Sequence, residues 1–158
     1  MKVNWLKLIV SIIICELAGI IGSLATMPNI PTWYASINKH VFNPPNWIFG
    51  PVWTTLFALM GISLYLVWEK GFKNKNIKLG IYAFSAQFAL NIVWSFLFFG
   101  LHNTLAAFTE IIFLWIAIFA TIFLFYKIDK KAAYVLIPYI CWVTFAAFLN
   151  YNVWILNV

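Results

Sequence analysis

The sequence has no arginine and only four acidic residues, and charged residues of every kind make up 9% of its 158 positions. A soluble domain of this length must present a mostly polar surface to water, and so few charges cannot cover one. Hydrophobic residues make up 65% of the chain instead. The composition therefore excludes an ordinary soluble domain and indicates that much of the surface faces lipid.

The net charge of +6 does not indicate a nucleic-acid partner. The lysines form no basic stripe interleaved with base-reading side chains, but lie in short gaps between apolar runs. Cys15 and Cys141 lie inside apolar runs, so we interpret both as small buried hydrophobic residues rather than as a disulfide or metal pair. We expect no metal site and no cofactor.

Five apolar stretches are long enough to cross a bilayer, since about 20 helical residues at about 1.5 Å each span a hydrocarbon core of about 30 Å. They cover residues 6–26, 48–68, 79–99, 104–126 and 133–154. None alternates apolar and polar residues as the strands of a membrane barrel do. The first stretch carries Glu16 in its middle, which argues against a cleavable signal peptide. We predict an all-α integral membrane protein, a bundle of five transmembrane helices forming a single domain over residues 1–158.

Lysine bias predicts the orientation of this bundle. Nine of the ten lysines lie before or at the start of the first span, between the second and third, or between the fourth and fifth, and only Lys39 lies on the other side. Short lysine-rich loops stay in the cytoplasm. We therefore predict a multi-pass protein of a prokaryotic cell membrane, with a cytoplasmic N-terminus and an external C-terminus.

The longest connection, residues 27–47, lies on the predicted outer side. It contains four prolines and the aromatic residues Trp33, Tyr34, Phe42 and Trp47. A stiff segment rich in aromatics does not resemble a flexible linker, and we interpret it as a lid over an apolar surface. The alternative is that its aromatics form an interfacial belt.

Polar and aromatic residues of the spans gather in the outer half, beneath this loop. Residues 87, 91 and 94 share one helix face, and so do residues 139, 142 and 146. The pattern predicts a cavity that suits a flat hydrophobic ligand. The alternative is that the same residues only hold helices together. The predicted walls of the cavity are Trp53, Asn91, Trp94, Trp142, Ala146 and Leu149.

Two carboxyl groups, Glu16 and Glu110, lie inside predicted spans. A carboxyl at that depth is costly and is a functional candidate by default. Two such groups on different helices and at different depths make a poor proton relay. We interpret Glu16 as the more structural of the two, and both roles stay open for Glu110.

Several motifs resemble the translocator protein family, also called the tryptophan-rich sensory protein or peripheral-type benzodiazepine receptor family. The similarity covers nearly the whole chain, in order and with matching spacing. The motifs are Trp33-Tyr34, Asn38-Lys39, Phe42-Asn43-Pro44-Pro45-Asn46-Trp47, Gly50-Pro51-Val52-Trp53, Ala89-Leu90-Asn91 with Trp94, Phe98-Phe99-Gly100, Pro138-Tyr139 with Trp142, and Leu149-Asn150-Tyr151.

The resemblance implies a five-helix bundle, often a homodimer, with a ligand pocket under the first loop. Family ligands include protoporphyrin IX, haem-related tetrapyrroles and other flat hydrophobic compounds. The implied pocket residues are the six predicted walls, to which we add Trp33, Trp47 and Tyr139 as candidate ligand-binding residues. Trp53 and Trp142 also match tryptophans tied to light-dependent porphyrin breakdown, and would be catalytic if that activity is present.

The chain departs from the family pattern at a few positions. Ala106 stands where animal members have a pocket tryptophan, and His40 and Phe42 differ within the lid. No basic residue follows Tyr151, so the animal cholesterol motif is incomplete and we predict no sterol binding through it. We predict a membrane receptor or sensor for porphyrins; the alternatives are a light-dependent porphyrin-degrading enzyme and a transporter of tetrapyrroles or other amphipathic molecules.

Overall fold

The computed structural model describes residues 3–72 and 74–158, and these residues form helices and connecting loops without a strand. Five helical segments are long and apolar enough to cross a membrane. The fold class predicted from the sequence is therefore confirmed. In chain order the helices are α1 (Trp5–Asn29), α2 (Trp33–Ser36), α3 (Asn46–Trp68), α4 (Lys75–Ser95), the π-helical turn η1 (Phe96–Gly100), α5 (Thr104–Ile128), α6 (Lys130–Val135) and α7 (Ile137–Leu156).

The helices extend beyond the predicted apolar stretches, because a helix ends at its capping residues rather than at the edge of its apolar run. The third membrane-length segment begins at Lys75 instead of residue 79, since the side chain of Asn74 accepts a hydrogen bond from the Asn76 amide. The fifth begins at Lys130 instead of residue 133, since Asp129 accepts one from the amide of Lys131.

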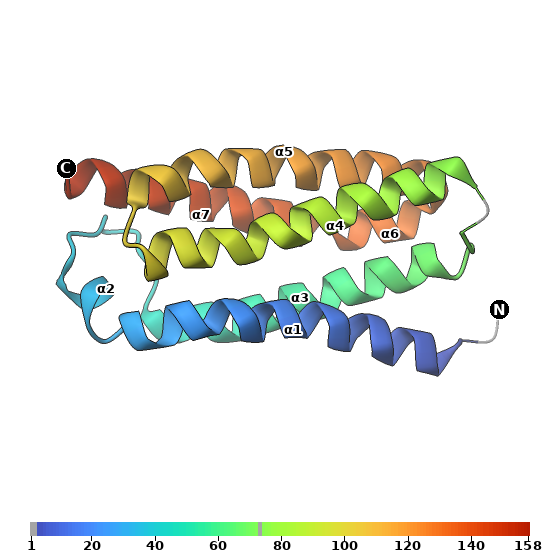
Figure 1. Cartoon of the computed structure of the whole chain (residues 1–158), viewed down its shortest axis with the longest axis horizontal. Helices are drawn as coiled ribbons and strands as arrows, with labels where there is room; N and C mark the ends of the chain where they lie inside the picture. Colours follow the sequence, from blue (N-terminus) through green and yellow to red (C-terminus); the bar gives the residue numbers. More distant parts are fainter. Residues whose placement is uncertain (1–2, 73) are drawn as a thin grey trace.

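The membrane-length helices lie side by side along the long axis, and the two termini lie at opposite ends (Figure 1). We call the end with the N-terminus the lysine end, and the end with α2 and the C-terminus the lid end. α1 packs against α3 and α4, α4 packs against α5, and α5 packs against α6 and α7. α3 packs against α6, whereas the backbones of α3 and α7 stay apart and only ring pairs such as Trp53–Tyr139 and Phe49–Trp142 join them. The ring of helices is therefore closed at the lysine end and left apart between α3 and α7 toward the lid end.

Close packing at the lysine end depends on one glycine and one hydroxyl. A Cβ atom on Gly61 would lie 2.5 Å from the Cα atom of Ile12, so only glycine permits this approach of α3 to α1. The buried hydroxyl of Ser63 donates a 2.8 Å hydrogen bond to the carbonyl of Ala132 in α6. Both contacts hold α3 against its neighbours at the lysine end, where the gap between α3 and α7 stops.

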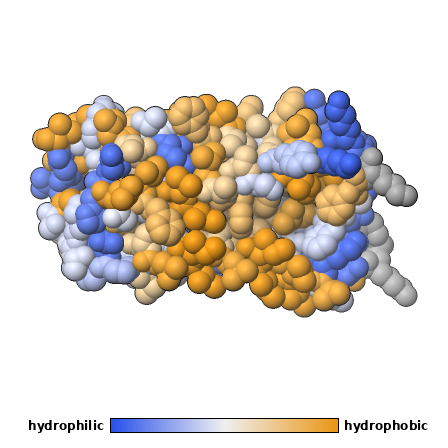
Figure 2. Space-filling view, in the orientation of Figure 1, coloured by the Kyte–Doolittle hydropathy of each residue, from blue (hydrophilic) through white to orange (hydrophobic). Residues whose placement is uncertain are grey.

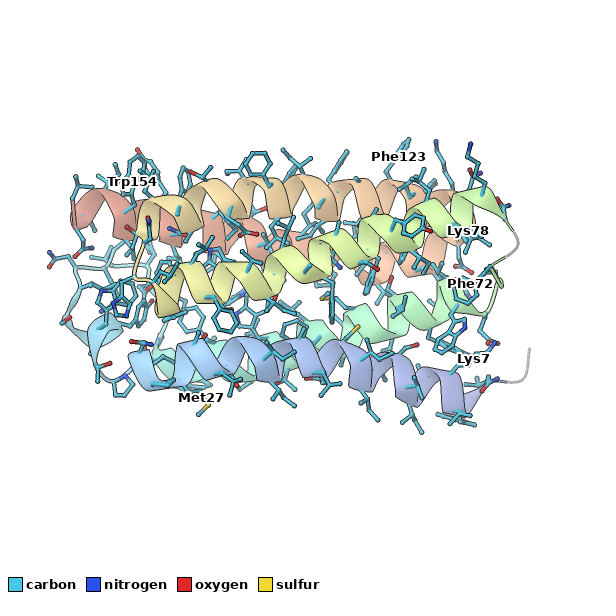
Figure 3. The ribbon with its side chains drawn as sticks, viewed as in Figure 1. Lys7, Met27, Phe72, Lys78, Phe123 and Trp154 are labelled. Atoms are coloured by element: carbon cyan, nitrogen blue, oxygen red, sulfur yellow. The ribbon has the colours of Figure 1, made fainter. Side chains whose placement is uncertain are left out.

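The surface carries an apolar band across the middle, with hydrophilic residues toward both ends (Figure 2). Lys7 and Lys78 lie at the lysine end, and Met27 and Trp154 lie toward the lid end (Figure 3). At the lysine end Lys7 forms a 2.9 Å ion pair with Glu69. This distribution is that of a protein surrounded by lipid at its waist and by water at its ends.

The two cysteines differ in burial. Cys15 is buried, as the sequence indicates, but Cys141 is exposed on α7, and the interpretation of it as buried is wrong. An apolar run in a membrane helix contains residues that face lipid as well as residues that face the protein, so hydrophobicity alone does not separate the two.

Candidate ligand-binding cavity

A cavity of about 480 Å³ lies in the lid half of the bundle. Residues of α1, α3, α4, η1 and α7 line it, together with Tyr34 of α2. Its volume falls in the range of about 300–1,000 Å³ that is typical of small-molecule sites. The cavity occupies the part of the bundle where α3 and α7 separate.

Seven of the nine residues predicted to bind ligand line this one cavity. They come from α3, α4 and α7, which are far apart in the sequence. They are Trp47, Trp53, Asn91, Trp94, Trp142, Ala146 and Leu149. The remaining two, Trp33 and Tyr139, are not among the residues that line it.

Trp33 supports the lid instead of facing the cavity. Its indole stacks on the imidazole of His102, with ring centroids 4.4 Å apart, and meets the ring of Phe98 edge-on at 5.4 Å. His102 has a positive φ of 53° and hydrogen-bonds Asn29 at 2.9 Å. Trp33 therefore anchors α2 to the turn between η1 and α5.

The lid itself is tied down at two places. The buried Tyr34 hydroxyl donates a 2.8 Å hydrogen bond to Asn43 within the loop. Burial raises the pKa of Tyr34 above its ordinary value while the bond to Asn43 opposes the shift, so the phenol stays neutral. Farther on, the amide of Asn38 donates to Asn157, and the Asn157 side chain donates back to the carbonyl of Asn38, both at 2.9 Å. These bonds fasten the loop to the end of α7.

Tyr139 lies behind the cavity wall, in a buried polar network. Its hydroxyl accepts a hydrogen bond from the Asn91 side chain and donates one to Gln87, both at 3.0 Å. All three residues are at least 95% buried. The network fixes the amide of Asn91, which is the one member that lines the cavity.

The three tryptophans deep in the wall are held differently. The indole N–H of Trp94 donates a 3.0 Å hydrogen bond to Asn150, whose amide donates to the carbonyl of Thr104 at 2.8 Å. Trp53 stacks on the ring of Phe57, with centroids 5.7 Å apart. The N–H of Trp142 is buried and has no acceptor among the residues that the structure describes.

The sequence analysis missed the wall that α1 contributes. Gly19 and Gly22 allow side chains of α3 and α4 to lie against α1. A Cβ on Gly19 would lie 2.8 Å from the ring of Phe57, and a Cβ on Gly22 would lie 3.0 Å from the hydroxyl of Ser95. Small or polar residues recur along this face at helical spacing, which was the available signal. The lining residues of α1 are Glu16, Ala18, Gly19, Ile20, Gly22, Ser23, Thr26 and Met27.

The two intramembrane carboxyl groups have separate surroundings. Glu16 lines the cavity, whereas Glu110 is buried elsewhere and neither of its oxygens has a hydrogen-bond partner within residues 3–72 and 74–158. Over those same residues no group of three His, Cys, Asp or Glu side chains could hold a metal ion. The cavity therefore offers aromatic surface, the fixed amides of Asn91 and Asn150, and the carboxyl of Glu16.

Comparison with known proteins gives matches over nearly the full length. The TspO/MBR family model matches residues 11–155. The chain is similar to the tryptophan-rich protein TspO of Archaeoglobus fulgidus, with 46% identity over 155 residues that cover 98% of this chain and 99% of that protein. It is also similar to the translocator protein of Bos taurus, with 35% identity over 95% of this chain and 89% of that protein. The tryptophan-rich sensory protein of Cereibacter sphaeroides is 30% identical over 99% and 95% of the two chains.

Proposed function

Because this chain belongs to the TspO/MBR family and is a multi-pass membrane protein, we propose that it is a membrane receptor or sensor that binds porphyrins. The ligand class comprises protoporphyrin IX, haem-related tetrapyrroles and other flat hydrophobic molecules. The observation that carries the proposal is that tryptophans from three helices line one cavity of about 480 Å³ beneath the first loop.

The chemistry of the walls supports a flat aromatic ligand. Indole rings provide large apolar faces, and aromatic pairs gain about 0.5–1.5 kcal/mol beyond the burial of their area. Trp53 and Trp142 enter the cavity from α3 and α7, whose backbones stay apart, so a flat ligand can contact indole rings of both helices. The amide of Asn91 supplies a polar contact that orients it.

Porphyrin titration in lipid nanodiscs tests the proposal through the shift of the porphyrin absorption maximum. Loss of indole contacts in Trp53→Phe or Trp142→Phe is expected to weaken binding of protoporphyrin IX about two- to tenfold, the equivalent of one stacking contact. Trp5→Phe is the matched control, because Trp5 is 67% exposed and lies outside the cavity. Wild-type affinity in both cavity variants would contradict the proposed site.

A second candidate is light-dependent porphyrin degradation, favoured by the presence of both Trp53 and Trp142 in the cavity wall. An electron-rich indole against a photoexcited porphyrin can donate an electron to it, and molecular oxygen then serves as the oxidant. This activity predicts loss of the porphyrin absorption band under illumination, with a defined product, and its absence in the two Phe variants. An equal rate with free tryptophan or with empty nanodiscs would refute it.

For orientation we propose a cytoplasmic lysine end and an external lid end in a prokaryotic cell membrane. The lysine end contains Lys7 and Lys78, and Lys39 is in the loop of the lid end. Short lysine-rich loops are retained in the cytoplasm. A cysteine replacing Lys39 should react with an impermeant thiol reagent added to intact cells, and a cysteine replacing Lys78 should react only after lysis. The reverse pattern would overturn the orientation.

We also propose a second copy of the chain as a partner. Ser85 and Ala89 of α4 are exposed and small, and such residues permit close helix contact in a bilayer. Gly19 and Gly22 are engaged within the chain by Phe57 and Ser95 and are not available for this contact. Cysteine at position 85 should cross-link two copies in native membranes; a cross-link from an exposed position on α1 instead would place the contact elsewhere.

A further inference from the structure

Glu16 is the only acidic residue among those that line the cavity. The other lining residues are apolar, aromatic or uncharged polar side chains. A carboxyl within a membrane span is costly to maintain, and a cavity that accepts ligands is one of the few places where it has a use. The role of Glu16 therefore depends on where in the cavity its carboxyl lies.

Glu16 lies at the floor of the cavity. α1 runs from the lysine end toward the lid end, and Glu16 is the first of its residues to reach the cavity. α3 runs the opposite way, and Phe57 is the last of its residues to do so. Beyond this level the two helices are in close contact, at Ile12 and Gly61. The carboxyl therefore marks the deep end of the space that a ligand can occupy.

No side chain among the described residues compensates Glu16. Neither a hydrogen bond nor an ion pair reaches its carboxyl from residues 3–72 or 74–158. At the opposite end of the cavity a positive charge is close by, because the ammonium of Lys39 lies 4.8 Å from the ring centre of Tyr34, a lining residue. The cavity therefore has an acidic side chain at its floor and a lysine ammonium close to its lid.

We propose that Glu16 is ionised in the cavity and determines ligand specificity by its charge. It excludes anionic groups from the floor, so that a tetrapyrrole with all its acid groups on one edge binds with that edge toward the lid. A tetrapyrrole with acid groups around its whole rim always places one of them at the floor and is rejected. Repulsion between like charges is strong where water is scarce, and this is a common basis of discrimination. The inference rests on the porphyrin-binding function proposed above.

Two porphyrins that differ in the placement of their acid groups test this selection. Protoporphyrin IX carries its propionates on one edge, and coproporphyrin carries one on every pyrrole ring. We expect the wild type in nanodiscs to bind protoporphyrin IX at least about tenfold more tightly than coproporphyrin. Glu16→Gln should reduce this ratio at least about fivefold, by strengthening the binding of coproporphyrin. Glu69→Gln, the same change at a site outside the cavity, should leave the ratio unchanged.

Further variants separate charge from folding. Glu16→Leu removes the same charge with a side chain that suits a membrane helix, and it should lower the ratio as Glu16→Gln does. Lys39→Gln should weaken the binding of protoporphyrin IX but not of its uncharged dimethyl ester, because the lid would no longer attract the propionate edge. An equal effect on acid and ester would overturn the proposed binding direction.

The outcomes distinguish this inference from the function on which it rests. If wild-type protein binds no porphyrin, the proposed function fails. If the wild type binds protoporphyrin IX but both Glu16 variants keep the wild-type ratio, the function stands and charge selection by Glu16 is refuted.

Discussion

Gly61 provides the most direct test of how α1 and α3 pack. In Gly61→Ala the new methyl carbon would lie 2.5 Å from the Cα atom and 2.9 Å from the backbone nitrogen of Ile12. Ordinary contacts of this kind start at 3.4 Å. Backbone atoms cannot rotate away as a side chain can, so the two helices must separate by about 1 Å, which forfeits a quarter to a half of each dispersion contact nearby.

The expected free-energy change combines two opposing effects. Overpacking a close contact costs about 1–3 kcal/mol, and the backbone obstacle places this site at the upper end. Alanine is the better helix former by about 1 kcal/mol, which offsets part of that cost. We expect a net loss of about 2 kcal/mol for Gly61→Ala. Gly50→Ala on the same helix is the control, since a Cβ at Gly50 meets no atom of another segment within 4 Å. Gly50 precedes Pro51, whose ring crowds the Cβ of a helical residue before it. The gain in helix propensity is therefore offset, and this variant should be about as stable as the wild type.

Reversible unfolding in mixed detergent micelles, followed by helical circular dichroism, measures both free energies. Only the methyl group at position 61 meets another helix, so the predicted gap of about 2 kcal/mol between the two variants reports the contact with α1. A Gly61→Ala protein as stable as the Gly50→Ala protein would show that α1 and α3 are not packed as closely as the structure places them.

Three further predictions concern buried or capping polar groups. Tyr139→Phe leaves the two amides that it joins without a partner and should cost about 2–3 kcal/mol on the same unfolding assay, with weaker porphyrin binding because the cavity amide is no longer held. Ser63→Ala removes the 2.8 Å bond to Ala132 and should cost about 1–2 kcal/mol, with no change in porphyrin affinity. Burial raises the pKa of Asp129, but the hydrogen bond and charge of Lys70 and the backbone amides lower it by more, so the folded pKa lies below the ordinary value. The ion pair between Lys70 and Asp129 therefore contributes fully to stability above about pH 4, and this contribution is lost as the pH falls through the folded pKa. The wild type should lose more stability on acidification than Asp129→Asn. Equal losses would contradict the pairing.

Hydrophobicity was sufficient to predict the five membrane helices, because lipid requires long apolar helices and leaves little else possible. It did not predict where they end, since Asn74 and Asp129 extend two of them through side-chain caps outside the apolar runs. Hydrophobicity also did not predict that Cys141 is exposed, because residues that face lipid and residues in the protein interior are of the same apolar types.

Helical spacing predicted most of the cavity and misplaced one residue for a geometric reason. Tyr139 and Trp142 are three positions apart, so their side chains differ by about 60° around the helix axis. That angle directs the indole into the cavity and the phenol toward Gln87 behind the wall. The wall on α1 was missed because its glycines become informative only when their partners, such as Phe57, are known.

The cavity follows from how the ring of helices closes. At the lysine end, α3 is held by the glycine contact to α1 and by the hydroxyl bond to α6, while at the lid end its backbone stays apart from α7. The wall opposite α3 cannot collapse into that space, because the Asn91 amide is fixed from behind by Tyr139 and the indole of Trp94 by Asn150. The donors that hold this wall, the Asn91 amide and the Trp94 indole, each have a side-chain acceptor. The hydrogen bonds behind the wall, rather than the tryptophans themselves, are therefore what keeps the cavity open for a ligand.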